Sequence, residues 1–245
     1  MKEALKWIYS RYCLMIFGLI FLFFTPLFWL FIHRRQWRKY ATKLNHWWAV
    51  WFWRLSFIPV KQIYQTTLDT GSQYVFCANH TSFLDIPLLG LCKNQFVFVG
   101  KSSIAKVPLF GYVFKKIHVT VDRTSLKSRY KTLQIAADTI DQGFSLAMFP
   151  EGGTERKPPN LDPFKDGAFR VAIEKQIPIV PVTIPYNWII LPNDQGLMVY
   201  RRTSVAIYHE PIFTEGLTLD DLDSLKEQVI RIIRAELLKY HPNGN

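Results

Sequence analysis

The feature that most constrains this chain is an uncharged, apolar stretch close to its N-terminus. Residues 12–32 read YCLMIFGLIFLFFTPLFWLFI, and no Asp, Glu, Lys or Arg interrupts them. A helix of this length is about 30 Å long and matches the hydrocarbon core of a bilayer. A buried core helix would carry a polar face, and a cleaved signal peptide would be followed by small residues rather than by HRRQWRKY. The stretch therefore predicts a membrane-anchoring helix.

Basic residues flank this helix on both sides and are more numerous after it. They are Lys2, Lys6 and Arg11 before it, and Arg34, Arg35, Arg38 and Lys39 after it. The positive-inside rule then predicts that the remaining chain lies on the cytoplasmic face, and the membrane we expect is the cell (inner) membrane. Residues 36–58 mix indoles with cations, which suits an interfacial helix in the headgroup layer. One spanning helix plus this interfacial helix is the first expectation, and a two-helix hairpin dipping into one leaflet is the alternative.

The net charge of +11 on 245 residues is unevenly distributed. The first 60 residues hold nine Lys or Arg against one acid, and seven of the eight tryptophans, whereas residues 61–245 carry only +3. The excess charge therefore belongs to the membrane-seeking segment, which argues against a soluble nucleic-acid binder. We predict an anchoring segment over residues 1–60 and a globular domain over residues 61–245.

The globular part alternates short apolar runs with amphipathic stretches. Strands are predicted at residues 74–78, 96–100, 117–121, 144–149, 177–184 and 204–209, and helices at about 85–93, 125–142, 166–176 and 219–240. This alternation predicts an α/β fold with a largely parallel mixed sheet flanked by helices. The three cysteines lack the spacing of a zinc or redox motif and predict buried, reduced thiols at Cys13, Cys77 and Cys92.

The motif NHTSFLD, residues 79–85, directly follows the predicted strand at 74–78. A histidine at a strand end with a carboxylate five residues later suits base catalysis, because Asp85 can orient one imidazole nitrogen of His80 and leave the other free. Open α/β sheets also bind their ligands at the carboxyl ends of strands. On these residues alone, a helix-capping Asp85 and a structural His80 remain an equal alternative.

The run FPEGGTER, residues 149–156, follows another apolar run. Paired glycines let backbone N–H groups approach an oxyanion or a phosphate, and Arg156 has the planar guanidinium that suits a phosphate or carboxylate. An ordinary loop with a solvated Glu/Arg pair is the alternative. The run 150–163 is also long and rich in Gly and Pro, as functional loops often are.

The order of these motifs resembles that of the glycerolipid acyltransferases. NHTSFLD is similar to that family's histidine-x4-aspartate motif, FPEGGTER to its Phe-Pro-Glu-Gly-Thr-Arg block, and KSSIAKVPLFGYVFKKIHVTVDR to its second block. Lys165, Gly167, Phe169 and IVPVTI fit the remaining blocks. The resemblance spans about residues 74–185 and is nearest to the bacterial 1-acylglycerol-3-phosphate acyltransferases. One Gly and one Glu are added in the third block, and Ser103 stands where the family often has an acid.

The resemblance implies an O-acyltransferase of phospholipid biosynthesis. It would transfer an acyl group from acyl-CoA or acyl-carrier protein to the 2-hydroxyl of lysophosphatidic acid, giving phosphatidic acid, with no metal or other cofactor. His80 and Asp85 would be the catalytic pair. The implied substrate-binding residues are Asn79, Lys101, Arg123, Glu151, Gly152, Gly153, Thr154 and Arg156, with Gly152 and Gly153 near the oxyanion and Lys101, Arg123 and Arg156 near the phosphate. IVPVTI would either wall an acyl slot or form a core strand.

No G-x-S-x-G elbow supplies a serine nucleophile, so a direct transfer fits better than an acyl-enzyme. The expected partners are a phospholipid membrane, lysophosphatidic acid and the acyl donor, and no nucleic acid. Acylation of another lyso-lipid or an amino-lipid is the alternative activity. A non-catalytic membrane-binding protein is the alternative from a different class.

Overall fold

A computed structural model describes residues 2–101, 107–121, 126–153 and 158–242 of the protein. The chain forms two compact units, each assembled from three separated segments. The first consists of Met1–Ile63, Thr81–Cys92 and Ile184–Ala206, and the second of Tyr64–His80, Lys93–Thr183 and Ile207–Asn245.

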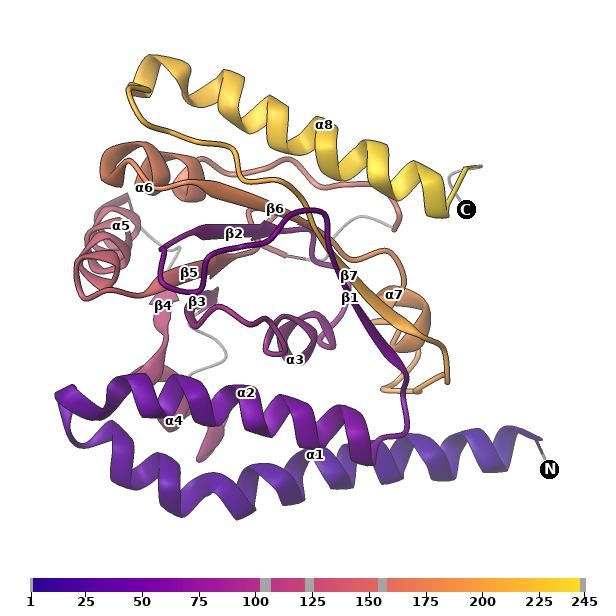
Figure 1. Ribbon diagram of the computed structural model, residues 1–245. Helices are drawn as coiled ribbons and strands as arrows, with labels where there is room; N and C mark the ends of the chain where they lie inside the picture. The colour runs from indigo at the N-terminus through magenta and orange to yellow at the C-terminus, as the bar shows by residue number, and fades with distance from the viewer. Residues whose placement is uncertain (1, 102–106, 122–125, 154–157, 243–245) are drawn as a thin grey trace. The chain divides into compact units, whose positions relative to one another are not determined.

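Two antiparallel helices dominate the first unit (Figure 1). They are α1 (Lys2–Ile32) and α2 (Arg38–Leu55), joined through the short 3₁₀ helix η1 (Arg35–Trp37). The start of α1 lies on the end of α2, because the Tyr9 and Tyr12 hydroxyls donate to the carbonyl oxygens of Ser56 and Leu55, both at 2.8 Å. Both predicted helices therefore exist, and α1 begins well before the apolar stretch.

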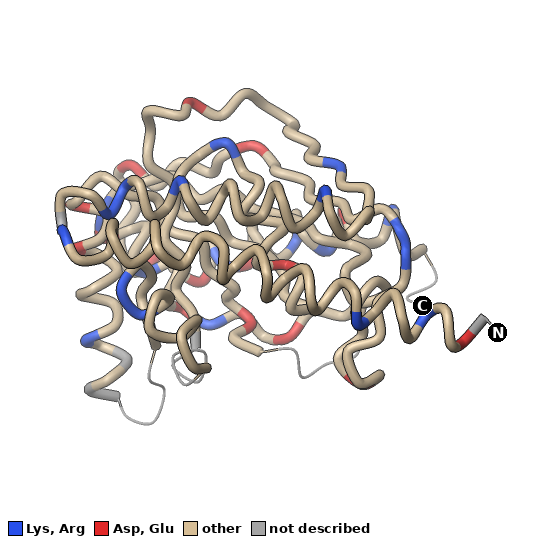
Figure 2. The backbone as a smooth tube through the Cα atoms, turned by 90° about the horizontal axis from the view of Figure 1, so that it is seen from below, with Lys and Arg blue, Asp and Glu red and all other residues tan. Residues whose placement is uncertain are grey.

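Most of the apolar part of α1 is not buried. Less than a quarter of its most apolar portion is buried within the structure, and its tube carries no charged residue over most of its length (Figure 2). Among the described residues, α1 is the one helix with the length and composition to cross a membrane. Its exposed apolar side chains include Leu19, Leu22, Phe23, Leu27 and Leu30.

The remaining helices of the first unit are short: α3 (Asp85–Leu89) and α7 (Asn187–Ile190). Helix α2 packs on α3, because Trp53 Nε1 donates to the Pro87 carbonyl at 3.0 Å and His46 Nδ1 lies 2.9 Å from the Gly90 oxygen. Gly90 permits this close approach, since a Cβ there would lie 3.0 Å from the Ala49 Cβ. The predicted helix at 85–93 thus ends early, and α7 was not predicted because a single turn shows no periodicity.

Within the described residues the sheet has seven strands, in the order β1-β7-β6-β2-β5-β3-β4. In chain order they are β1 (Val60–Tyr64), β2 (Val75–Ala78), β3 (Phe96–Lys101), β4 (Val119–Val121), β5 (Ser145–Met148), β6 (Ile179–Thr183) and β7 (Ser204–Tyr208). Strands β2 to β6 pair in parallel, and β7 is antiparallel to β6. The predicted largely parallel mixed sheet is therefore confirmed. Strand β6, which contains IVPVT, is fully buried as a core strand.

Four longer helices accompany the sheet in the second unit: α4 (Phe110–Ile117), α5 (Leu126–Asp141), α6 (Gly167–Lys175) and α8 (Leu222–Tyr240), the last preceded by the 3₁₀ helix η3 (Leu219–Asp221). Helices α6 and α8 cover one face, where Phe169, Ile173, Val229 and Ile233 form one core cluster (Figure 1). The strand predicted at 117–121 begins only at Val119, because Gly111, Val113, Phe114 and Ile117 make a helical buried face. All three cysteines are free and buried, as predicted.

Candidate functional site

The predicted base, His80, lies just beyond the carboxyl end of β2. Its imidazole stacks on Phe149, with ring centroids 4.1 Å apart and 20° between the planes. Phe149 follows β5, and β5 pairs in parallel with β2. Because parallel neighbours end at the same edge of a sheet, His80 and the start of the glycine loop lie together in the second unit.

The glycine loop begins with a tight turn after β5. Gly152 has a φ of +76°, a conformation that favours glycine. Its N–H donates to the Phe149 carbonyl at 3.0 Å, so this N–H is engaged within the turn. The N–H of Gly153 has no hydrogen-bond partner within the described part of the chain.

Glu151 ties this loop to the histidine turn. Its side chain is 6% exposed, and its two oxygens accept the backbone N–H groups of His80 and Asp162, both at 2.7 Å. Burial raises the pKa of Glu151 to about 7, although both hydrogen bonds favour the ionised form. The carboxylate therefore connects three parts of the chain: the end of β2, the end of β5 and the far side of the loop.

A cavity of about 480 Å³ opens beside the same loop. Its lining is mainly apolar and includes Phe149, Gly152, Lys165 and Arg170. The apolar lining side chains come from β3, β4, β5, α5 and the segment before α6; they are Val99, Val121, Leu133, Met148 and Phe164. Sequence analysis did not single out Arg170. The available signal was its position about one helical turn after Asp166 and Gly167, at the start of α6.

Asp85, the second predicted catalytic residue, lies in the first unit and is 0% exposed. Its Oδ2 accepts the N–H groups of Thr81 and Ser82 at 2.7 and 2.9 Å, and its Oδ1 accepts Asn187 Nδ2 at 2.8 Å. Asn187 Oδ1 in turn accepts the Ser204 hydroxyl at 2.6 Å. The N–H of Thr81, which directly follows His80, thus donates to this carboxylate. A hydrogen bond between the His80 and Asp85 side chains stays a prediction.

Asn187 and Ser204 are the partners that sequence analysis missed. They follow Asp85 by more than one hundred residues, and no local pattern connects them to the NHTSFLD motif. Asn79 is buried just before His80. Lys101 is the last residue of β3, whose carboxyl end belongs to the same edge as those of β2 and β5. Arg123, Thr154 and Arg156 lie outside the described residues.

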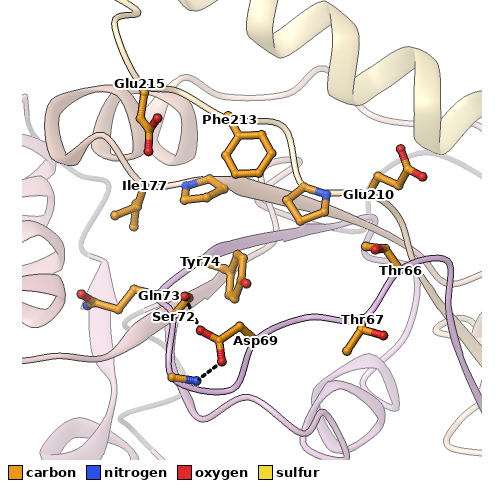
Figure 3. Close-up of a pocket in the computed structure, with 13 residues that line it drawn as sticks. Thr66, Thr67, Asp69, Ser72, Gln73, Tyr74, Ile177, Glu210, Phe213 and Glu215 are labelled. Atoms are coloured by element: carbon orange, nitrogen blue, oxygen red, sulfur yellow. Dashed lines mark hydrogen bonds between the residues drawn. The ribbon is translucent and has the colours of Figure 1, made fainter.

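A second hollow, of about 650 Å³, lies at the amino ends of β2 and β6 (Figure 3). Acidic side chains line it, namely Asp69, Glu210 and Glu215. Asp69 accepts the Ser72 hydroxyl at 2.6 Å and the Gly71 N–H at 3.0 Å, and these bonds lower its pKa. Three carboxylates would repel a phosphate, so the carboxyl edge is the better candidate for an anionic ligand.

The family comparison agrees with the position of these motifs. A family model described as "Acyltransferase" matches residues 59–185, just over half of the chain. This range begins immediately before β1 and ends just after β6, and it contains both the histidine turn and the glycine loop.

Curated relatives share this part of the chain. The chain is 29% identical over 184 residues to a chloroplastic 1-acyl-sn-glycerol-3-phosphate acyltransferase, BAT2, of Brassica napus, covering 71% of this chain and 52% of that one. It is 31% identical over 179 residues to the chloroplastic LPAT1 of Arabidopsis thaliana, covering 71% and 50%. The human 1-acyl-sn-glycerol-3-phosphate acyltransferase alpha is 28% identical, with 72% and 65% covered. The chain thus spans about half the length of the first two relatives.

One solved structure has a similar fold over nearly the whole chain. It is the 1-acyl-sn-glycerophosphate (LPA) acyltransferase PlsC from Thermotoga maritima, with a TM-score of 0.80, 98% of both chains covered and 19% identity. At this identity the likeness concerns the fold, including the N-terminal helices.

Proposed function

The chain belongs to the acyltransferase family, and from this membership we propose that it acylates the 2-hydroxyl of 1-acylglycerol-3-phosphate to give phosphatidic acid. Its relatives in Brassica napus, Arabidopsis thaliana and human are named 1-acyl-sn-glycerol-3-phosphate acyltransferases. The observation that carries the proposal is the juxtaposition of the His80 turn and the glycine loop through Glu151. This arrangement offers a base and backbone donors at one edge of the sheet.

In the proposed reaction, His80 removes the proton of the acceptor hydroxyl as its oxygen attacks the thioester carbonyl carbon. The C–S bond then breaks, the thiolate leaves with a proton from the imidazolium, and an ester forms. Asp85 orients the imidazole and stabilises its cationic form. The burial of Asp85 and its three hydrogen-bond donors support this role, since a fixed carboxylate can hold one imidazole tautomer.

The oxyanion of the tetrahedral intermediate needs a preorganised donor. We assign this donor to the N–H of Gly153 rather than that of Gly152, because the Gly152 N–H already donates to Phe149 O. Gly153 follows the turn directly and carries no side chain to hinder an approaching thioester. One such donor contributes on the order of 10²–10³ in rate in other acyl-transfer enzymes.

The acceptor phosphate requires cations, for which the family resemblance implies Lys101, Arg123 and Arg156. The cavity beside the glycine loop adds Lys165 and Arg170. Its apolar lining suits an alkyl chain. Lys165 and Arg170 suit a phosphate, and the one carboxylate among the described lining residues, Asp166, is paired with Lys226. We therefore propose that this cavity, rather than the buried strand β6, accepts the apolar part of a substrate.

The N-terminal helices would bring the site to its lipid substrate. We propose that they form a hairpin that dips into one leaflet on the cytoplasmic face of the cell membrane. If α1 spanned the bilayer, the antiparallel helix α2 would have to cross it in the other direction. This does not fit α2, because it carries cations and packs on α3 through His46 and Trp53. Ser10, near the start of α1, also accepts the Val199 N–H at 2.8 Å.

A labelling experiment separates the hairpin from the spanning helix. Single cysteines replace Leu5 and Arg34 in the full-length protein in sealed vesicles, and a membrane-impermeant thiol reagent is added outside. The hairpin predicts that both positions react from the same side. Reaction from opposite sides would establish a spanning α1.

The activity is tested by His80→Ala in the full-length enzyme, with lysophosphatidic acid as acceptor and acyl-CoA or acyl-carrier protein as donor. We expect acyl transfer to fall by about 10²–10⁴-fold, the usual contribution of a general base. His33→Ala, which alters an exposed histidine at the end of α1, is the matched control and should retain activity. Near-normal activity of His80→Ala would refute the assignment of the base. If the enzyme preferred a lyso-lipid without a free phosphomonoester, the proposed acceptor, lysophosphatidic acid, would be wrong.

A further inference from the structure

The basic charge of the globular part is concentrated in one segment. Residues 86–121 contain five lysines and no acid, so the rest of residues 61–245 carries a net charge of −2. The lysines are Lys93, Lys101, Lys106, Lys115 and Lys116. Two of them lie on α4, one turn before β4. Lys115 and Lys116 therefore give this helix a positive charge, although the domain as a whole is nearly neutral.

Helix α4 is strongly amphipathic. One of its faces is buried and consists of Gly111, Val113, Phe114 and Ile117. The other face exposes Tyr112, Lys115 and Lys116. Lys116 Nζ lies 5.8 Å from the centre of the Tyr112 ring. The outward face thus combines an aromatic ring with two cations.

Apolar side chains extend this face at the start of the helix. Val107 is 50% exposed, Leu109 48% and Tyr112 47%. Leu109 has a φ of +62° and a ψ of −57°, and it is the centre of a γ-turn in which the Phe110 N–H donates to the Pro108 oxygen at 2.6 Å. Solvent-exposed aliphatic residues beside lysines and an aromatic ring are typical of surfaces that enter the interfacial layer of a bilayer.

We propose that this surface, formed by Val107, Leu109, Tyr112, Lys115 and Lys116, is a second lipid-binding surface, distinct from the N-terminal helices. Its occupant is an anionic membrane surface: the lysines meet phosphate groups, while the apolar side chains enter the boundary between headgroups and acyl chains. The choice of an anionic lipid rests in part on the proposed function, whose acceptor and product both carry a phosphate. The surface would anchor the catalytic unit directly.

Helix α8 provides a contrast within the same unit. It lies on the other side of the sheet from α4 (Figure 1) and exposes Arg231, Arg234 and Leu238. Its charges are mixed, however, with Lys226 paired to Asp166 and Asp223. A face with balanced charge has no electrostatic attraction to an anionic bilayer, so α8 serves as the control surface.

The test uses the full-length protein with an environment-sensitive fluorophore at Tyr112→Cys or, as control, at Leu238→Cys. The native cysteines are buried and do not compete for the label. Protein sedimented with vesicles of phosphatidylcholine and phosphatidic acid is compared with protein in detergent-free buffer. We expect the emission at position 112 to shift to the blue and resist aqueous quenchers, while that at position 238 stays unchanged.

Charge variants identify the electrostatic part. Lys115→Ala/Lys116→Ala should weaken insertion of the position-112 label about 30-fold, since two basic residues are removed and each contributes about 1 kcal/mol near an anionic surface. Arg231→Ala/Arg234→Ala should leave it unchanged. The proposal is overturned if the label at position 112 stays as exposed to aqueous quenchers as the label at 238. It is also overturned if an acidic acyl-carrier protein protects the position-112 label from the quenchers and vesicles do not. The fluorescence does not depend on catalysis, so an inactive enzyme with an inserted label would overturn only the proposed function.

Discussion

Two buried carboxylates, one in each unit, accept backbone N–H groups of the histidine turn and differ in their other partners. Asp85 accepts two backbone N–H groups and the amide of Asn187, which is itself hydrogen-bonded to Ser204. Glu151 accepts two backbone N–H groups, from His80 and Asp162. Asp85 thus has a side-chain partner that can reorient, whereas the donors to Glu151 within the described residues belong to the backbone.

This difference predicts opposite responses to the same substitution. An amide side chain presents one acceptor and one donor group where a carboxylate presents two acceptors. At Asp85 the partner amide of Asn187 can flip, placing its oxygen toward the new donor and its NH₂ toward the Ser204 hydroxyl oxygen. At Glu151 neither backbone N–H can change from donor to acceptor. We therefore expect that losing the negative charge lowers the activity most at Asp85. Losing a hydrogen-bond acceptor should lower the free energy of unfolding most at Glu151.

The largest effect is expected for the activity of Asp85→Asn. We expect acyl transfer to fall by about 10²–10⁴-fold, because the amide no longer stabilises a cationic His80. The free energy of unfolding should change by less than about 1 kcal/mol, since the Asn187 flip restores the hydrogen bonds. Steady-state kinetics and thermal unfolding in detergent measure the two quantities. A folded, fully active variant would exclude Asp85 from the catalytic pair.

Glu151→Gln should show the reverse pattern, with its main effect on stability. At about pH 5 we expect a loss of about 1–3 kcal/mol, because one buried N–H is left facing an NH₂ group. The pKa of Glu151 is raised from 4.5 to about 7, so its stabilising contribution is complete below pH 4.5 and is lost as the pH rises through 7. The advantage of wild type over the variant in unfolding free energy should therefore fall by about 3 kcal/mol over this range, so that it vanishes or changes sign above pH 7.

The measurement is chemical unfolding of both proteins at several pH values between 4.5 and 8. Taking the difference between the two cancels the contributions of all other titrating groups. A constant difference would show that Glu151 is ionised throughout, and the contrast with Asp85 would then lie in the hydrogen-bond donors alone.

Asn187→Ala tests the side-chain half of the Asp85 network. Removing the amide leaves Asp85 Oδ1 and the Ser204 hydroxyl without this partner, and we expect a loss of about 1–3 kcal/mol. Asn193→Ala is the matched control: Asn193 is exposed and donates a longer bond, 3.2 Å, to the Thr81 carbonyl. Equal unfolding free energies for the two variants would mean that Asn187 does not hold Asp85.

The smallest effect concerns the packing beneath α3. Gly90→Ala places a methyl group about 3.0 Å from the Ala49 Cβ and 3.2 Å from the Pro87 oxygen, so α2 must shift, and we expect a loss of about 1 kcal/mol. In an Ala49→Gly background the same substitution should cost less, which a double-mutant cycle measures. A stabilising Gly90→Ala would show that α2 moves freely relative to the Asp85 helix.

Much of the fold could be predicted because buried runs and helical periodicity are local properties. Several elements agree with the predictions within a few residues: the strands at 75–78, 96–101 and 145–148 and the helices at 126–141 and 222–240. Strand β1, VKQIY, was missed because its burial is only intermediate along most of its length. Helix α4 was missed because its eight residues contain a glycine and begin beside a proline-containing turn.

The sequence by itself determined the anchor-like helix and the position of His80 at a strand end. Composition decides whether a segment can leave water, and motif spacing decides what lies next along the chain. Only the tertiary structure decided that Asn187 and Ser204 complete the Asp85 network, and that Glu151 binds the N–H groups of His80 and Asp162. These partners lie far apart in sequence or across a loop. Their selection depends on how strands and helices pack, because a buried carboxylate must find its donors wherever the fold brings them.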